Sequence, residues 1–291
     1  MSEISCPNMV DRAEELFVEG EYAASLLLAA AAVGALDAEV GDTRLFESRA
    51  SRLVAMGHQS LGHLDRAVLW AERALTAAER IEEEAPEELG AALHARAILH
   101  LERGQLREAV PRLERAAELL DEAGDEHRAD YHAVLLTMAE ASMAMGDIDT
   151  AKSGFESVLE DVGDMDPESD THAGALNAIT AKAMLGLGGV YAQQDERDES
   201  KDLLARAIEF FDAAYGQNHP EMIAALEEVA AIYRVLGDDD AARTIEEQLA
   251  VAARMLAEAE ASFRASVAPP LGDAAGSVRL DEDGPVTLGV R

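Results

Sequence analysis

The amino-acid sequence predicts an all-α solenoid of six antiparallel helix hairpins, and three observations support this prediction. Glycine recurs every 42 residues at Gly20, Gly62, Gly104 and Gly146, and it recurs again at Gly237. Small residues repeat in step with the glycine, and the apolar residues between the turns follow the period of an α-helix. Units of this kind bury their apolar faces by stacking on their neighbours, so the repeat indicates a solenoid.

Three columns of small residues accompany the repeated glycine. The first column lies seven positions before it, at Ala13, Ala55, Ala97, Ala139, Gly188 and Ala230. Two more columns lie five and twelve positions after it, at residues such as Ser25 and Ala32. Small side chains let two antiparallel helices approach closely, and a glycine between the helices can take the left-handed conformation that ends the first one.

The repeat divides residues 1–266 into units of two helices each. We place the units at about 7–40, 44–84, 87–123, 128–161, 171–214 and 219–266. Their second helices should begin near Tyr22, Leu64, Leu106, Ile148, Arg197 and Asp239. The helical spacing is clear from Leu106 to Leu120, where apolar residues fall at i, i+4, i+7, i+11 and i+14.

Turn-forming residues separate the units, for example at Ala85-Pro86, Gly124-Asp125 and Gly216 to Pro220. The fifth unit has Asp195 in place of the turn glycine and follows an interval of 49 residues instead of 42. The segment from Asp161 to Thr171 is rich in turn formers, so we expect a loop there that holds the seven extra residues.

The last helix should run to about Phe263 and cap the open end of the stack. Residues 267–291, in which proline and glycine are frequent, should form a flexible tail. Apolar residues alternate in this tail from Val278 to Val290, which leaves two alternatives. The tail either lies extended against a groove or stays idle.

Composition narrows the classes of partner. The chain has 58 acidic and 24 basic residues and a formal net charge of −34. Such a charge repels phosphate backbones and anionic lipids, so we expect no binding to nucleic acid or to membranes. The sequence shows neither a signal-peptide core nor an apolar run that spans a bilayer, which predicts a cytoplasmic protein. Cys6 is the one cysteine, so an internal disulfide is excluded.

The sequence offers no pattern typical of catalysis. No two of the eight histidines have the i, i+4 spacing that would aim both imidazoles at one metal ion. Gly186, Gly188 and Gly189 look superficially like a nucleotide-binding loop, but no strand precedes them, and we interpret them as helix-packing residues. Acidic runs such as Glu82 to Glu84 lack a partner base. We therefore expect no enzyme activity, no cofactor and no metal.

Several short sequences match a known repeat class. They are Leu187-Gly188, Tyr191, Ala207, Gly20-Glu21-Tyr22 and Gly146-Asp147-Ile148. With the small-residue columns, they make the chain resemble the tetratricopeptide repeat from about Pro7 to Ser266. The 42-residue period and the phrase from Tyr215 to Pro220 are similar to the repeats of kinesin light chains and their bacterial relatives. The resemblance implies a right-handed superhelix and a role as a protein-interaction scaffold.

The resemblance also implies that the first helix of each hairpin lines a concave groove. Residues beside the first small column, and those at i−4 and i+3 from them, should point into it. In the first four units these are Val10, Glu14 and Phe17; Arg52, Met56 and Gln59; His94, Ile98 and Leu101; and Leu136, Glu140 and Met143. Their apolar members suit an amphipathic helix or an extended peptide of a partner protein.

The groove differs from two known ligand styles of this repeat class. It lacks both the lysine and asparagine clamp for a terminal carboxylate and the asparagine ladder of kinesin light chains. Glu14 and Glu140 instead favour a ligand that carries Arg or Lys. The alternatives to a scaffold are a peptide-sensing regulatory receptor and an accessory subunit of a larger complex.

Overall fold

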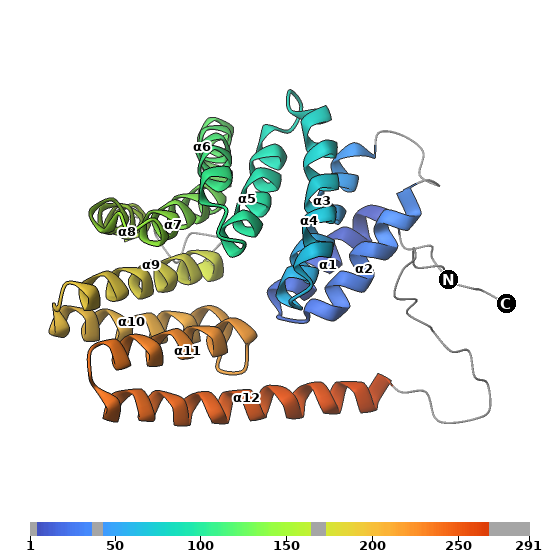
Figure 1. Ribbon diagram of the computed structural model, residues 1–291. Helices are drawn as coiled ribbons and strands as arrows, with labels where there is room; N and C mark the ends of the chain where they lie inside the picture. Colours follow the sequence, from blue (N-terminus) through green and yellow to red (C-terminus); the bar gives the residue numbers. More distant parts are fainter. Residues whose placement is uncertain (1–4, 37–42, 164–172, 268–291) are drawn as a thin grey trace.

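The computed structural model describes residues 5–36, 43–163 and 173–267. In these ranges the chain forms six hairpins of α-helices stacked into a curved array, which confirms the all-α superhelix (Figure 1). The first helices are α1 (Cys6–Val18), α3 (Arg44–Ser60), α5 (Pro86–Glu102), α7 (Arg128–Ala144), α9 (Ala173–Gln193) and α11 (Pro220–Val235). The second helices are α2 (Tyr22–Ala35), α4 (Leu64–Ala78), α6 (Leu106–Ala123), α8 (Ile148–Gly163), α10 (Arg197–Tyr215) and α12 (Asp239–Val267). Short 3-10 turns, η2 (Glu79–Ile81) and η3 (Asp125–His127), follow α4 and α6.

The second helices begin at the six residues that the repeat predicts. Each hairpin turn contains one residue with a positive φ, such as +77° at Gly62. In the turn after α3, the backbone N–H of His63 donates to the carbonyl of His58, which satisfies an otherwise open helix end. Asp195 occupies the same position in the fifth hairpin with a φ of 60°. Aspartate tolerates this conformation better than most residues with a Cβ, so the fifth hairpin closes without glycine.

The small-residue columns lie where the two helices of a hairpin cross. Ala13, for example, is fully buried between α1 and α2. Where the second column holds a serine, the buried hydroxyl group donates across the hairpin to a carbonyl of the first column. Ser25 Oγ lies 2.7 Å from the Ala13 carbonyl oxygen, and Ser200 Oγ lies 2.8 Å from that of Gly188. The serines thus keep the close approach without leaving a buried polar group unpaired.

The three clustered glycines lie within α9, as the helix-packing interpretation predicts. A Cβ at Gly186 would lie 2.4 Å from Cζ of Phe155, which α8 contributes to the core. A Cβ at Gly188 would lie 3.1 Å from Leu204 of α10. Because glycine has no side chain, α9 can pack closely on both α8 and α10 at these positions.

The first helices form the inner layer of the array. Each contacts the first helix of the next hairpin, from α1 and α3 through to α9 and α11, while the second helices cover them from outside. Among the described helices, none combines the length and the apolar character that crossing a bilayer requires. The predicted loop between the fourth and fifth units lies outside the described residues except for 161–163, which end α8. The predicted tail lies outside them except for Val267, which ends α12.

Candidate interaction surface on the inner helices

Ten of the twelve predicted groove residues are at least partly exposed. The other two, Val10 and Leu136, are 0% and 4% exposed and belong to the hydrophobic core. The same register position holds Arg52 on α3 and His94 on α5, which are partly exposed. A short apolar side chain at this position stays in the core, whereas a long polar one extends past it. Val10 and Leu136 therefore cannot be contact residues of an inner surface.

The apolar members of the predicted groove divide into two groups. Phe17, Leu101 and Met143 are half-buried and pack against core clusters. Met56 on α3 and Ile98 on α5 are also half-buried, but within the described residues they join none of the core clusters. Of the apolar residues in the predicted groove, these two are therefore the ones that are partly exposed and outside the core clusters.

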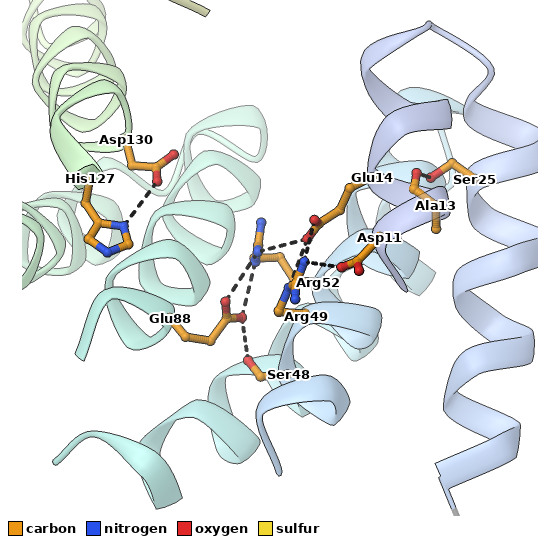
Figure 2. A network of polar contacts seen from close by, with 10 residues as sticks. All are labelled: Asp11, Ala13, Glu14, Ser25, Ser48, Arg49, Arg52, Glu88, His127 and Asp130. Atoms are coloured by element: carbon orange, nitrogen blue, oxygen red, sulfur yellow. Dashed lines mark hydrogen bonds and ion pairs between the residues drawn. The ribbon is translucent and has the colours of Figure 1, made fainter. Parts of the chain in front are cut away.

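Charged residues of α1, α3 and α5 form a network on the inner side of the first three hairpins (Figure 2). Arg49 contacts Glu14 at 2.6 Å and Asp11 at 3.0 Å. Arg52 lies 3.3 Å from Glu88, a carboxylate that also accepts a hydrogen bond of 2.8 Å from Ser48. These contacts tie α1 to α3 and α3 to α5.

Burial acts against the charge of Arg52, because it lowers the pKa of the guanidinium group. The carboxylates of Glu88, Glu14 and Asp130 together outweigh this effect, with Glu88 contributing most, so the pKa of Arg52 stays above its ordinary value. Glu88 is 5% exposed, which makes the pair largely buried. A second pair in the same view, His127 and Asp130, lies apart from this network at the start of α7 (Figure 2).

A hydrogen bond links α5 to α7. His94 Nε2 lies 2.9 Å from Thr137 Oγ1, and the Thr137 hydroxyl group donates to the Ala133 carbonyl at 2.9 Å. Since the hydroxyl proton is already committed, the His94 Nε2–H must be the donor between the two side chains. Burial, together with the positive charges of Arg52 and Lys182, lowers the pKa of His94 to about 4, so the ring is neutral at physiological pH.

The inner surface of the last three hairpins contains an ion pair and two further carboxylates. Lys182 of α9 lies 3.0 Å from Glu221 of α11, and Tyr22 of α2 donates to the same carboxylate at 3.3 Å. Glu140 of α7 is exposed, and among the described residues it has no hydrogen bond or ion pair. Although water reaches this carboxylate, the surrounding helices remove much of its hydration, and its pKa rises to about 7. Lys182 opposes this rise, and Glu228 adds to it.

Together these contacts form what we call the polar belt, a row of side chains that crosses each inner helix. Its members are Glu14, Arg49, Arg52, Glu88, His94, Thr137, Glu140, Lys182 and Glu221. The predicted groove residues include four of them. The other five, Arg49, Glu88, Thr137, Lys182 and Glu221, were not predicted, because they fall outside the three groove positions chosen on each helix. Lys182 carried one usable signal, since the chain has only three lysines.

The belt changes one expectation about charge. Glu14 was expected to attract a basic ligand, but it is already paired with Arg49. Glu140, in contrast, has no ion pair among the described residues. Across the residues that the structure describes, no group of three or more His, Cys, Asp or Glu side chains has the arrangement of a metal site.

Comparison with a family model supports the helical repeat in the last two hairpins. A family model described as Tetratricopeptide repeat matches residues 179–255, which cover most of the fifth and sixth hairpins. None of the curated proteins matches the chain. Among solved structures, BtubC (BKLC) from P. vanneervenii is similar at 16% identity, covering 96% of each chain with a TM-score of 0.49. Pseudomonas aeruginosa PilF has 16% identity, covering 90% of this chain and 97% of its own, with a TM-score of 0.49. A Podosopora anserina structure of nearly identical TPR-like repeats, of the kinesin light chain type, is similar at 20% identity. The match covers 70% of this chain and 93% of that one, with a TM-score of 0.46.

Proposed function

We propose that this chain, a tetratricopeptide repeat protein, is a non-catalytic cytoplasmic scaffold whose inner surface binds a peptide or a helix of a partner protein. Proteins of this repeat class are typically scaffolds that bind other proteins. The partner is a protein rather than a nucleic acid or a membrane, because a net charge of −34 repels both of the latter.

The observation that carries this proposal is the pair Met56 and Ile98. Both side chains are apolar, partly exposed and outside the core clusters, and both lie on inner helices. An apolar side chain that adds little to the core is available to a ligand. Adaptable side chains such as methionine suit the apolar face of a bound helix or peptide.

The charges beside this pair indicate what else the partner carries. Arg49, Arg52 and Lys182 already have acidic partners within the chain, so they offer little to an acidic ligand. Glu140 has no such partner among the described residues. A partner segment with apolar residues followed by a Lys or Arg would complement Met56, Ile98 and Glu140.

The test compares two double variants of the full chain. Met56→Glu with Ile98→Glu places two charges on the inner surface. Leu27→Glu with Leu69→Glu places two charges on the outer helices α2 and α4, where these leucines are 62% and 72% exposed. Both variants change the net charge equally, and circular dichroism checks that the half-buried Met56 and Ile98 can be replaced without loss of helicity.

Each protein is used to capture partners from a lysate of the source cells, and captured proteins are identified by mass spectrometry. We expect one protein to be retained by the wild type and by the outer variant and lost from the inner variant. Titration of that protein should show at least a tenfold weaker affinity for the inner variant, about 1.4 kcal/mol. Equal binding by both variants, with helicity unchanged, would show that the inner surface is not the binding site. Capture of no protein by the wild type would favour a receptor for a small peptide.

A further inference from the structure

The first and sixth hairpins touch, although they lie at opposite ends of the array. The contact joins the turn after α1 to the residues that start α11 (Figure 1). We call this contact the clasp and define it by Val18, Gly20 and Tyr22 on one side and His219, Pro220 and Glu221 on the other. Solenoid repeats otherwise contact only their neighbours, so the clasp is a long-range contact that the repeat itself does not require.

His219 is the centre of the clasp. Its Nδ1 accepts a hydrogen bond of 3.1 Å from the backbone N–H of Glu221, which caps the start of α11. Nδ1 therefore carries no proton, and Nε2 is the N–H group that donates to the Val18 carbonyl at 3.1 Å. The neutral ring thus satisfies both nitrogens, and at 7% exposure it has little contact with water.

The absence of a side chain at Gly20 leaves room for this histidine. A Cβ at Gly20 would lie 2.8 Å from His219 Nε2 and 2.8 Å from Pro220 Cδ. The equivalent glycine of the second hairpin, Gly62, has nearly the same φ, 77° against 79°, and a Cβ there would meet nothing within 4 Å. The two turns have the same conformation, but only the first is packed against another hairpin in this way.

Protonation of His219 is incompatible with this geometry. A proton on Nδ1 would face the N–H of Glu221, so the cap of α11 would be lost and two donors would oppose each other. The ring also stacks on Tyr215 of α10, with centroids 4.5 Å apart, and meets the edge of Tyr22. Lys182 of α9 disfavours a positive charge here, while Glu221 and the Val18 carbonyl favour it. Burial is the largest influence and lowers the pKa of His219.

We propose that His219 is a pH-sensitive clasp, which holds the superhelix closed while the imidazole is neutral and lets the first and sixth hairpins separate when it is protonated. The proposal goes beyond scaffold function and does not depend on which partner binds. Because each hairpin is supported by its neighbours, opening changes the path of the superhelix and leaves the six hairpins folded. Opening would widen access to the polar belt, whose Lys182–Glu221 pair lies beside the clasp.

The test measures the separation of the two hairpins in the full chain. Spin labels are attached at Leu27→Cys on α2 and Val235→Cys on α11, both exposed positions, with Cys6→Ser to remove the native thiol. Distances are measured by pulsed electron paramagnetic resonance. In this background, Gly20→Ala breaks the clasp, and Gly62→Ala is the matched control with the same backbone strain.

At about pH 8, Gly20→Ala should shift the label distance to longer and broader values, and Gly62→Ala should match the parent. Between about pH 8 and pH 5, the parent should shift toward the Gly20→Ala distribution, while His219→Gln, which does not titrate, should not respond to pH. Equal distances for the two glycine variants would overturn the clasp. A parent that does not respond to pH, or His219→Gln responding as the parent does, would overturn the role of His219. Loss of helicity by circular dichroism over the same range would also overturn it, because opening leaves the hairpins folded.

Discussion

Replacing Gly186 with alanine should destabilise the protein, although alanine is the better helix former. The added Cβ would lie 2.4 Å from Cζ and 2.6 Å from Cε1 of Phe155. Phe155 is 0% exposed and packs in the core between α8 and α9, so its ring has no solvent to move into. Either the ring or the whole of α9 must shift.

The magnitude follows from two opposing effects. Removing a glycine from a helix interior stabilises it by about 0.5–1 kcal/mol. Overpacking a filled core costs about 1–3 kcal/mol, and a contact of 2.4 Å belongs at the upper end of that range. We therefore expect Gly186→Ala to lower the free energy of unfolding by about 1–2 kcal/mol. For a chain of this size, that is a fall of several degrees in melting temperature.

Gly189, three residues further along α9, is the matched control. A Cβ there would lie 3.6 Å from Ile232 Cδ1, an ordinary contact, so Gly189→Ala should stabilise by about 0.5–1 kcal/mol. Both variants are compared with the wild type by thermal and urea unfolding, followed by circular dichroism. Adding Phe155→Leu to Gly186→Ala should cost less than the two single changes together. If Gly186→Ala and Gly189→Ala shift stability in the same direction, the close packing of Phe155 on α9 is refuted.

Three further predictions concern charge and pH. Arg52→Ala should cost about 1–3 kcal/mol in urea unfolding, because it leaves the buried Glu88 without its cation, while Arg73→Ala, which breaks an exposed pair, should cost less than about 1 kcal/mol. His132 is 0% exposed, neither of its ring nitrogens has a hydrogen-bond partner among the described residues, and burial lowers its pKa. The unfolded chain then binds more protons below about pH 6.5, so stability should fall as pH drops through that value, and His132→Leu should reduce the fall. Raising salt from low to molar concentration should raise the melting temperature by screening the net charge of −34, and a melting temperature independent of salt would contradict this.

The candidate surface could be predicted only in part. Met56 and Ile98 lie on the inner helices, as the predicted groove positions require, and we propose them as contacts. The predicted groove positions are wrong for Val10 and Leu136, which are buried. A position at the edge of the core is buried or exposed according to the length of its side chain. The prediction also assigned Glu14 to a ligand, since the sequence does not reveal that Arg49 of the next hairpin reaches it.

The sequence by itself determined the number of hairpins, their turns and the residues at their crossings. These features depend on residues close together in the chain, such as a turn glycine and the small residues seven before and five after it. Asp195 could be recognised in the same way as the turn residue of the fifth hairpin, because the small residues before and after it keep the same spacing.

The tertiary structure alone decided how the hairpins meet one another. Tyr22 and Glu221 are 199 positions apart, and Val18 and His219 are 201 apart, yet both pairs form hydrogen bonds. Whether such residues meet depends on small rotations between neighbouring hairpins that add up along the array. No local pattern encodes that sum, so the closure of the superhelix and the function of His219 can be read only from the folded chain.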